Sequence, residues 1–381
     1  MEELSEANAR WRAKVETMDQ KIFDELFVLE IANNHWGKVD RGLKIISTYN
    51  QIVRFNGVRA ALKLQIRDVP SFIHKDFLGR TDIRYIKKTL DTALPFEGYA
   101  ALVEAIRKGP CIPMATPFDE ASVDTCMKLG IPLLKIASYD INDWFLIERI
   151  AATRKPVIVS TGGASLKETD DIVSFFEKRN IPLAINHCVS LYPTEDDELE
   201  LNQLDFLRMR YPGHVIGLST HEYHDWTTSM YIAYAKGART FERHVDIEMD
   251  GVSVSPYCSL PAQIDTWFKA FEHAKRACGV PSSMRRIPQS REIEYLNALV
   301  RGVYAKRDLP AGYMLEHGPS LWEDVYLAIP LQKGQISCRE LMSGEVLLKD
   351  IAKDQPIMID AIDCPYAHDE RLRSLIFHRG L

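Results

Sequence analysis

The chain has 381 residues, of which 46% are hydrophobic and 26% are charged, which is the composition of an ordinary globular protein of two or three domains. Its formal net charge is −6 and no long basic run occurs, so a nucleic-acid partner is not expected. No apolar run approaches the roughly 20 residues that cross a bilayer, and the seven cysteines are dispersed without a CxxC pair. Because no apolar signal-peptide region precedes the fold, these features favour a cytoplasmic protein with reduced thiols and no membrane partner.

The segment before the first apolar run, residues 1–25, is polar. Within it Trp11, Val15 and Met18 recur at the spacing of one helix face. We therefore expect an N-terminal helical extension that lies outside the main fold.

A repeated motif begins after this extension. A short apolar, β-branched run is followed by a polar or glycine residue and then by an amphipathic stretch, such as Ser165–Lys178 or Leu199–Tyr211. The eight apolar runs are Phe27–Ile31, Val58–Leu64, Ile112–Thr116, Leu133–Ala137, Val157–Ser160, Leu183–Asn186, Val215–Ser219 and Thr240–His244. Eight such repeats over about 250 residues predict a (β/α)₈ TIM barrel over residues 26–280. No GxGxxG motif follows the first run, which argues against a dinucleotide-binding fold.

The pattern changes after the eighth repeat. The polar, proline-containing segment at residues 281–297 is predicted to be a linker. Residues 298–361 are predicted to form a small, mostly β domain, and residues 362–381 a charged tail. The strands expected in this domain are Val300–Ala305, Leu327–Ile329 and Ile357–Ile359.

Polar side chains stand where the predicted barrel strands end. In such barrels the catalytic groups come from the C-terminal ends of several strands, so these side chains are expected to form one ring. In chain order they are Glu30, Lys63, Gln65, Thr116, Lys135, Ser138, Ser160, Thr161, Ser190, Tyr192, Ser219, His221, Glu242 and His244.

Two lysines lie inside apolar strands, and each needs a partner because a buried, unpaired charge is costly. Three interpretations remain open for Lys63 and Lys135. They form ion pairs with a carboxylate such as Glu30, they bind an anion together with the neighbouring hydroxyls, or one of them is a Schiff-base nucleophile.

Two histidines follow neighbouring strands. His221 and His244 are suited to a divalent metal with open coordination positions, although structural histidines are an equal alternative from spacing alone. His35, His187 and His224 are nearby in the pattern and are not excluded by it.

Eight short motifs, in order, resemble those of the sialic-acid synthase family. The segment after them, Val300–Asp360, is similar to the antifreeze-like (SAF) domain of that family. The motifs are Glu30–Gly37, Leu62–Gln65, Thr116–Asp119, Lys135–Ser138, Ser160–Gly163, His187–Thr194, Gly217–His221 and Glu242–His244.

This resemblance implies a synthase that joins phosphoenolpyruvate to an open-chain aldose and releases phosphate and a nonulosonic acid. It implies Mn²⁺ or Mg²⁺ on His221 and His244, and a homodimer in which the SAF domain is swapped. It assigns Glu30, Asp140 and Lys63 to catalysis. It assigns phosphoenolpyruvate binding to Lys63, Thr116, Lys135, Ser138, Ser160, Ser190, Tyr192 and Ser219, and acceptor binding to Gln65, Tyr192 and Asp140.

The departures from the family concern the acceptor side. Asp140 stands where the family has a glutamate, Ser255 near the place of an aspartate, and Ile329 at the place of an arginine from the SAF domain. They predict the same donor with a different acceptor, less polar or differently substituted than N-acetylmannosamine. Two alternatives remain, a Schiff-base aldolase on the same barrel and a non-catalytic sugar-binding homologue.

Overall fold

The computed structural model describes residues 20–249, 251–281, 283–316, 318–341 and 344–380. Most of the predicted N-terminal extension, including Trp11, Val15 and Met18, lies outside the described residues. The chain divides into two compact units, Met1–Gly279 and Val280–Leu381. None of the helices in the described part of the chain is long and apolar enough to cross a membrane.

The first unit is a closed barrel of parallel strands in the order β1 to β8, and the predicted (β/α)₈ barrel is therefore confirmed. All eight apolar runs form strands. Their bounds are β1 Leu26–Ala32, β2 Ala60–Ile66, β3 Ile112–Pro117, β4 Leu133–Ile136, β5 Val157–Ser160, β6 Leu183–Cys188, β7 Val215–Ser219 and β8 Thr240–His244.

The barrel closes between its first and last strands, where Leu26 pairs with Thr240 and Glu30 with His244. Apolar side chains that point inward, such as Val28, Met114 and Ile158, fill one end of the barrel interior. A larger apolar core lies between the strands and the surrounding helices. Since both faces of each strand are covered, the strands are continuous apolar runs, as expected for a buried parallel sheet.

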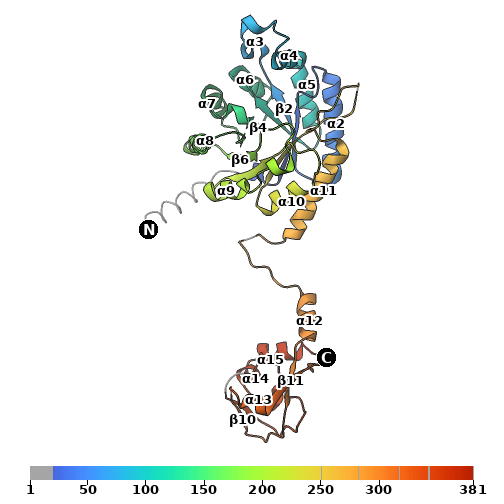
Figure 1. The fold of residues 1–381 in the computed structure, drawn as a ribbon, viewed down its shortest axis with the longest axis vertical. Coiled ribbons are helices and arrows are strands. Elements are labelled where there is room, and N and C mark those ends of the chain that lie inside the picture. The colour runs from blue at the N-terminus through green and yellow to red at the C-terminus, as the bar shows by residue number, and fades with distance from the viewer. Residues whose placement is uncertain (1–19, 250, 282, 317, 342–343, 381) are drawn as a thin grey trace. The chain divides into compact units, whose positions relative to one another are not determined.

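Helices surround the strands on the outside of the barrel (Figure 1). The capping box of Ser165 and Glu168 starts one of them, α8, where the sequence predicts a helix. The helix predicted at Leu199–Tyr211 is shorter, because a 3₁₀ turn at Asp196–Glu198 and further turns precede it. The main helices are α2 Val39–Asn56, α5 Phe96–Arg107, α6 Glu120–Lys128, α7 Trp144–Ala152, α8 Leu166–Lys178, α9 Gln203–Arg210, α10 Thr228–Ala235 and α11 Pro261–Cys278.

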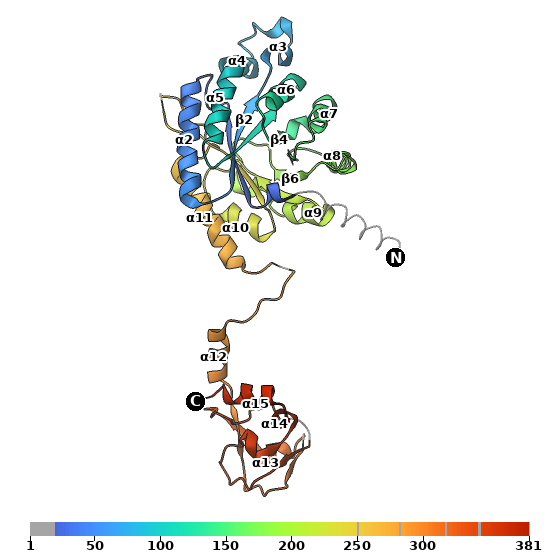
Figure 2. The same cartoon turned by 180° about the vertical axis from the view of Figure 1, so that it is seen from behind.

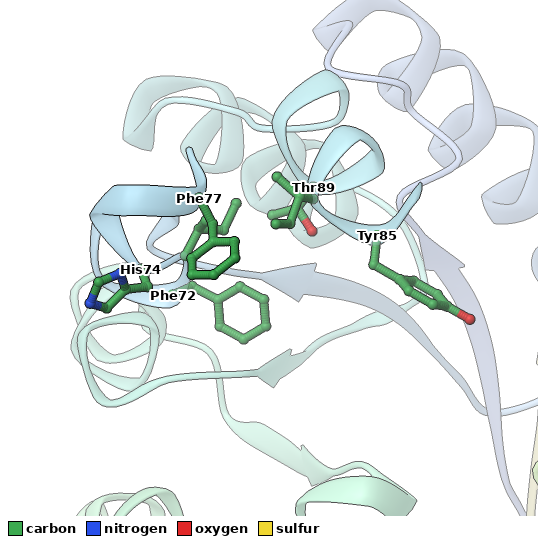
Figure 3. Close-up of a pocket in the computed structure, with 7 residues that line it drawn as sticks. Phe72, His74, Phe77, Tyr85 and Thr89 are labelled. Atoms are coloured by element: carbon green, nitrogen blue, oxygen red, sulfur yellow. The ribbon is translucent and has the colours of Figure 1, made fainter. Parts of the chain in front are cut away.

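An insertion between β2 and α5 carries two additional helices, α3 Val69–Phe72 and α4 Arg84–Asp91. Figure 2 shows these helices together at one end of the barrel. A cavity of about 290 Å³ lies within the insertion, and Figure 3 shows the rings of Phe72 and Phe77 side by side in it. None of the site residues predicted from the sequence lines this cavity.

The second unit has a three-stranded sheet in the order β10-β12-β13 and a two-stranded sheet of β9 and β11. A helix, α12 Ser290–Ala298, occupies half of the predicted linker. The strand predicted at Ile357–Ile359 is wrong, since this segment forms only an isolated bridge at Met358 and then a 3₁₀ turn. The strand bounds are β9 Gly302–Ala305, β10 Met314–Leu315, β11 Val325–Ala328, β12 Glu345–Leu347 and β13 Ile362–Asp363.

The C-terminal residues are part of this unit. Strand β13 pairs with β12, so the boundary predicted at residue 361 falls inside a sheet. Helix α15, Glu370–Phe377, follows, and Arg379 beyond it forms a buried ion pair with Glu340. Ile376 is part of the apolar core of the unit. The tail is therefore a packed element of the second unit.

Candidate active site

Two lysines and two glutamates form a buried ion-pair cluster inside the barrel. Strand register brings them together, because Glu30 is paired with Lys63 on one side and with His244 on the other. Lys63 forms ion pairs with Glu30 and with Glu242, whose Oε1 lies 3.2 Å from its Nζ. Lys135 Nζ lies 2.5 Å from Glu242 Oε2. The side chains are at most 6% exposed, so each charge depends on its partners.

The ion pair between Lys63 and Glu30 that the sequence allowed is present, and Glu242 is a second carboxylate whose role the sequence did not predict. Burial lowers the pKa of Lys63 to about 8, although the charge of Glu242 opposes this. Burial alone would raise the pKa of Glu242, but the charges of Lys135 and Lys63 outweigh it and lower that pKa. An anion bound here would share the two lysines with two carboxylates.

Hydroxyl groups from neighbouring strand ends lie beside this cluster. Thr116 Oγ1 accepts a hydrogen bond from Lys63 Nζ at 3.0 Å. The backbone N–H of Gly162 donates to Ser138 Oγ at 3.1 Å. A Cβ atom at Gly162 would collide with the hydroxyl oxygens of both Ser138 and Ser190, so these two groups converge on one backbone position. The arrangement requires glycine there.

Two further serines end strands of the same barrel. Ser160 is 3% exposed, and its Oγ has no hydrogen-bond partner in the described structure. Ser219 is paired in register with Glu242. Buried hydroxyls without a partner are uncommon, and at a strand end of a barrel they indicate a ligand that completes the hydrogen bonding.

His221 and His244 lie next to each other, with ring centroids 5.3 Å apart. The Nδ1 of His221 lies 3.1 Å from the carbonyl oxygen of Val189 and donates to it, which leaves Nε2 as an acceptor. The Nδ1 of His244 is buried without a partner. Burial lowers the pKa of His221 to about 4 and that of His244 well below its ordinary value. Both imidazoles are therefore neutral at pH 7, the form that binds metals.

This pair fits part of a divalent-metal site. Among the residues that the structure describes, no group of three His, Cys, Asp or Glu side chains has the arrangement of a metal site. Two neutral imidazoles would supply two ligands and leave the other positions to substrate and water. His187 bonds to the carbonyl oxygen of Leu199, and His224 pairs with Glu195. His35 Nδ1 accepts from the backbone N–H of Gly37, and its buried Nε2 has no hydrogen-bond partner among the described residues.

Two tyrosines enclose the histidines. The ring of Tyr192 lies 4.0 Å from that of His221 and 5.2 Å from that of Tyr257, centroid to centroid. Tyr257 lies 5.2 Å from His244. Tyr257 belongs to the loop after β8, and no pattern in the sequence connects it with Tyr192. The four rings form an aromatic box on one side of the barrel mouth.

The remaining predicted acceptor residues, Gln65 and Asp140, lie near Arg67. Arg67 Nη1 donates to Gln65 Oε1 at 3.1 Å. Burial, followed by the charge of Asp143, raises the pKa of Asp140 to about 7, and the charge of Arg67 opposes this. The Oδ2 of Asp140 is buried without a hydrogen-bond partner. Arg67 was not predicted as a site residue, although it follows the end of β2 directly.

Comparison with known proteins identifies the family. Residues 60–282 match the NeuB family over more than half of the chain. The chain belongs to this family. Its fold is closely similar to a solved spore coat polysaccharide biosynthesis protein E from Chromobacterium violaceum, with a TM-score of 0.83 and 36% identity over 89% of this chain and 99% of that one.

Named enzymes are more distant relatives. An N-acetylneuraminate-9-phosphate synthase of Drosophila melanogaster is 24% identical, over 90% of this chain and 97% of the fly protein. A pseudaminic acid synthase of Campylobacter jejuni is 27% identical, over 78% of this chain and 85% of the bacterial protein. The relatives of this chain thus include synthases named for two different products, N-acetylneuraminate 9-phosphate and pseudaminic acid.

Proposed function

We propose that this chain is a phosphoenolpyruvate-dependent synthase that adds a pyruvyl unit to an open-chain aldose, making a nonulosonic acid and releasing phosphate. The observation that carries the proposal is the placement of Lys63 and Lys135, with strand-end hydroxyls, beside a pair of neutral histidines. Relatives that are named synthases of such sugar acids support it.

The donor is held by the lysines and hydroxyls. Lys63 and Lys135 offer ammonium donors to the phosphate and carboxylate of phosphoenolpyruvate, and charged donors form the stronger hydrogen bonds. The hydroxyls of Thr116, Ser138 and Ser160 complete the contacts, together with those of Ser190, Tyr192 and Ser219. Glu30 and Glu242 pair with the lysines and hold them in place before the donor binds.

The acceptor aldehyde reacts beside the histidines. A divalent ion on His221 and His244, Mn²⁺ or Mg²⁺, would polarise the aldehyde oxygen. The methylene carbon of phosphoenolpyruvate forms a carbon–carbon bond with the aldehyde carbon, whose oxygen takes up a proton. Glu30 and Gln65 face this reaction from the first two strands.

Water completes the reaction at the former enol carbon. It adds there, loses a proton, and the bond from that carbon to the phosphate oxygen breaks, which leaves a keto acid and free phosphate. Asp140 is the group proposed to accept the proton of this water, because its pKa of about 7 suits proton transfer near neutral pH.

The second unit is proposed to be an antifreeze-like (SAF) domain that covers the barrel of a partner subunit in a homodimer. Its short strands and its place after the barrel in the chain support this. In this arrangement Ile329 replaces a charged contact to the sugar.

The test is phosphate release from phosphoenolpyruvate across a panel of aldoses, with mass spectrometry of the product. A product heavier than the aldose by one pyruvic acid unit is expected with at least one sugar. If no aldose stimulates phosphate release, the proposal fails, and a non-catalytic sugar-binding role replaces it.

One observation favours a Schiff-base aldolase as the second candidate, since burial lowers the pKa of Lys63 to about 8 and a neutral amine is the nucleophile. Borohydride trapping in the presence of pyruvate separates the two candidates. The aldolase leaves a covalent adduct on Lys63, whereas the synthase leaves none.

A further inference from the structure

An ion pair is buried behind the strand ends that carry the two histidines. Glu222 directly follows His221 after β7, and Arg243 directly precedes His244 on β8. The two charged side chains pair with each other and are at most 2% exposed. Because each of them is the sequence neighbour of one histidine, the ion pair joins the two backbones at the positions that carry the imidazoles.

Arg243 lies on the outer face of the barrel, among apolar side chains. Leu29 is its partner in register on β1, Phe241 precedes it on the same face of β8, and both belong to the core between the strands and the helices. The guanidinium carbon lies 5.7 Å from the centroid of the Trp226 ring and 5.8 Å from that of Trp267. A buried ion pair often stabilises a fold no more than apolar side chains of the same volume, so we expect this one to have a role beyond stability.

The carboxylate of Glu222 is held from several directions. Besides its ion pair, it accepts hydrogen bonds from the hydroxyls of Thr220 and Ser229. Thr220 lies on the other side of His221 in the sequence, and its backbone N–H donates to the carbonyl oxygen of Glu242 at 3.1 Å. The residues on both sides of His221 are therefore fixed to each other and to β8.

Arg243 extends this connection to the loop after β8. Its Nη1 donates to the carbonyl oxygen of Glu222 at 3.3 Å and to Ser259 Oγ at 3.1 Å. The backbone N–H of Ser259 donates in turn to the carbonyl oxygen of His244 at 2.8 Å. One guanidinium thus connects the residue after His221 with the residue that holds the backbone of His244.

The two imidazoles differ in how they are oriented. His221 Nδ1 donates to the carbonyl oxygen of Val189, whereas the buried Nδ1 of His244 has no hydrogen-bond partner among the described residues. A histidine that binds a metal is normally oriented by a hydrogen bond on its other ring nitrogen. The direction of His244 therefore depends on the β8 backbone and on the rings packed against it, such as that of Tyr257.

We propose that Glu222 and Arg243 are positioning residues, which hold His221 and His244 at the separation and orientation that one divalent ion requires. Both act through the backbone, since each is the neighbour of a histidine and lies behind the strand ends. The inference rests on the divalent ion of the proposed function and adds the residues that pre-form its site. Ligands that are already in place lose less conformational freedom when the ion binds, so the ion binds more tightly.

The experiment measures the dissociation constant of Mn²⁺ for the full chain without substrate, from the loss of the free-ion signal in electron paramagnetic resonance. Arg243→Lys keeps the charge, but a lysine lacks the planar fork that reaches Glu222 and Ser259 together. Glu222→Gln keeps the shape of the side chain and removes its charge. Each variant should weaken Mn²⁺ binding about 10- to 100-fold, the usual effect of changing residues that orient metal ligands.

A double variant separates positioning from stability. Glu222→Gln/Arg243→Met leaves no buried charge without a partner, so its melting temperature should be close to that of the unmodified chain. It also lacks the connection between the two strand ends, so its Mn²⁺ affinity should remain as low as that of the single variants. This variant keeps the test decisive if a single variant does not fold.

Ile172→Ala is the matched control. Ile172 is fully buried on α8 and packs in the same core as Phe241, but not at the ends of β7 and β8. Removing it should lower the melting temperature, as a cavity in the core does. The dissociation constant of Mn²⁺ should stay within about twofold, because the site and the substitution are independent.

Three results overturn the inference while the divalent ion stands. They are unchanged Mn²⁺ affinity in Arg243→Lys and Glu222→Gln, affinity that returns with stability in the double variant, and an equal loss of affinity in Ile172→Ala. If the unmodified chain binds no Mn²⁺, the divalent ion of the proposed function fails and the inference fails with it. Phosphate release from phosphoenolpyruvate then still decides whether the chain is a synthase.

Discussion

The buried charges of the barrel are balanced in pairs. Lys63 and Lys135 share Glu242, and Lys63 also pairs with Glu30. Replacing Lys63 leaves Glu30 buried without a partner, which costs about 3–5 kcal/mol of stability. A single lysine substitution therefore changes the free energy of unfolding as well as ligand binding, and a test of donor binding has to separate the two effects.

The first prediction compares Lys63→Met with Lys63→Met/Glu30→Gln. Both remove the ammonium, so both should weaken phosphoenolpyruvate binding by roughly 1.5–3 kcal/mol, measured by titration calorimetry. Only the single variant leaves Glu30 unpaired, so it should have the lower melting temperature. Lys135→Met should weaken binding to a similar degree. Unchanged donor affinity in both lysine variants would exclude the anion site.

The second prediction concerns Asp140. Burial and Asp143 raise its pKa to about 7, so the proton-accepting form predominates only above that pH. We expect kcat/KM to rise about tenfold per pH unit below 7 and to level off above it, and Asp140→Asn to lower activity by about 10²–10⁴ and remove this slope. A pH–rate profile that stays sloped in Asp140→Asn would assign the titration to another group.

The same carboxyl affects stability. Its proton is held more tightly in the folded chain than in the unfolded one, so stability falls as pH rises from about 4 to 7 and is constant above. Asp140→Asn should remove this loss of stability with rising pH. The loss is at most about 4 kcal/mol for a shift of about three pKa units. Chemical denaturation at pH 5 and at pH 8 measures it.

Single-residue patterns predicted the ring of strand-end groups but not their partners. The lysines, hydroxyls and histidines were recognised because each follows an apolar strand. Glu242 was named as a strand-end residue, yet its contact with both lysines depends on strands that are far apart in sequence. Arg67 lies on a loop, where neither periodicity nor strand position indicates the direction of a side chain.

At the scale of elements, the ends of β7 and β8 bring the histidines together. The two strands are paired from Gly217 with Thr240 to Ser219 with Glu242, so the residues that follow these pairs emerge side by side. Behind them Arg243 forms a buried ion pair with Glu222 and donates to the Ser259 hydroxyl at 3.1 Å. This pair ties the two strand ends to each other.

The third prediction is that these ends hold one divalent ion. A chelator should abolish turnover, and Mn²⁺ or Mg²⁺ should restore it, with bound metal measured by atomic absorption. The double variant His221→Ala/His244→Ala should lose both metal and activity. His224→Ala is the control, since that side chain is 55% exposed and pairs with Glu195. Metal and activity retained in the double variant would show that other ligands are used.

The fourth prediction concerns the C-terminal helix α15. Arg379→Ala removes one half of a buried ion pair and leaves Glu340 uncompensated, at a cost of about 3–5 kcal/mol. Hydrogen exchange of the full chain should become faster across β9 to β13, with unchanged exchange in the barrel strands. Arg373, an exposed arginine of α15, provides the comparison. Equal exchange in Arg373→Ala and Arg379→Ala would contradict a stabilising role for the pair.

Elements were predicted well where the pattern was long and periodic. The strands at 157–160, 215–219 and 240–244 have the predicted bounds, because a buried parallel strand is a continuous apolar run. The second unit was predicted less well. Its strands have two to four residues, and Ile357 is buried in its core without belonging to a strand. Burial without regular pairing produces the same apolar signal as a short strand.

At the scale of the whole molecule, the fifth prediction is a homodimer with two-fold symmetry, in which the second unit serves the partner's barrel. Light scattering should give twice the chain mass. In a mixing experiment, Lys63→Met full-length chains are combined with chains that end at residue 279. The first supplies an intact second unit and the second an intact barrel, so activity should appear only in the mixture. An active monomer would contradict the proposal.

The fold of the whole chain was predictable because the number of repeats determines the architecture. Eight strand–helix repeats close into a barrel, and the NeuB family match and the solved relative agree with it. The boundary between the two units, after Gly279, coincides with the point in the sequence where the periodic strand–helix repeats end and short, irregular segments begin. The acceptor was not predictable at this scale, since sugar specificity depends on a few side chains and not on the architecture.

The closure of the barrel has a consequence for how the protein is made. Strand β1 pairs with β8, whose first residue follows that of β1 by about 210 positions, and Arg41 after β1 binds Asp246 after β8. At translation rates of about 5–20 residues per second, β8 is synthesised roughly 10–40 s after β1, so one edge of β1 is unpaired for that time. During that interval Arg41, which is buried in the folded protein, lacks its ion-pair partner Asp246. Until β8 has been synthesised the growing sheet is therefore open, with an unpaired edge at β1, and the pairing of the first strand with the last can form only after the other strands have been made.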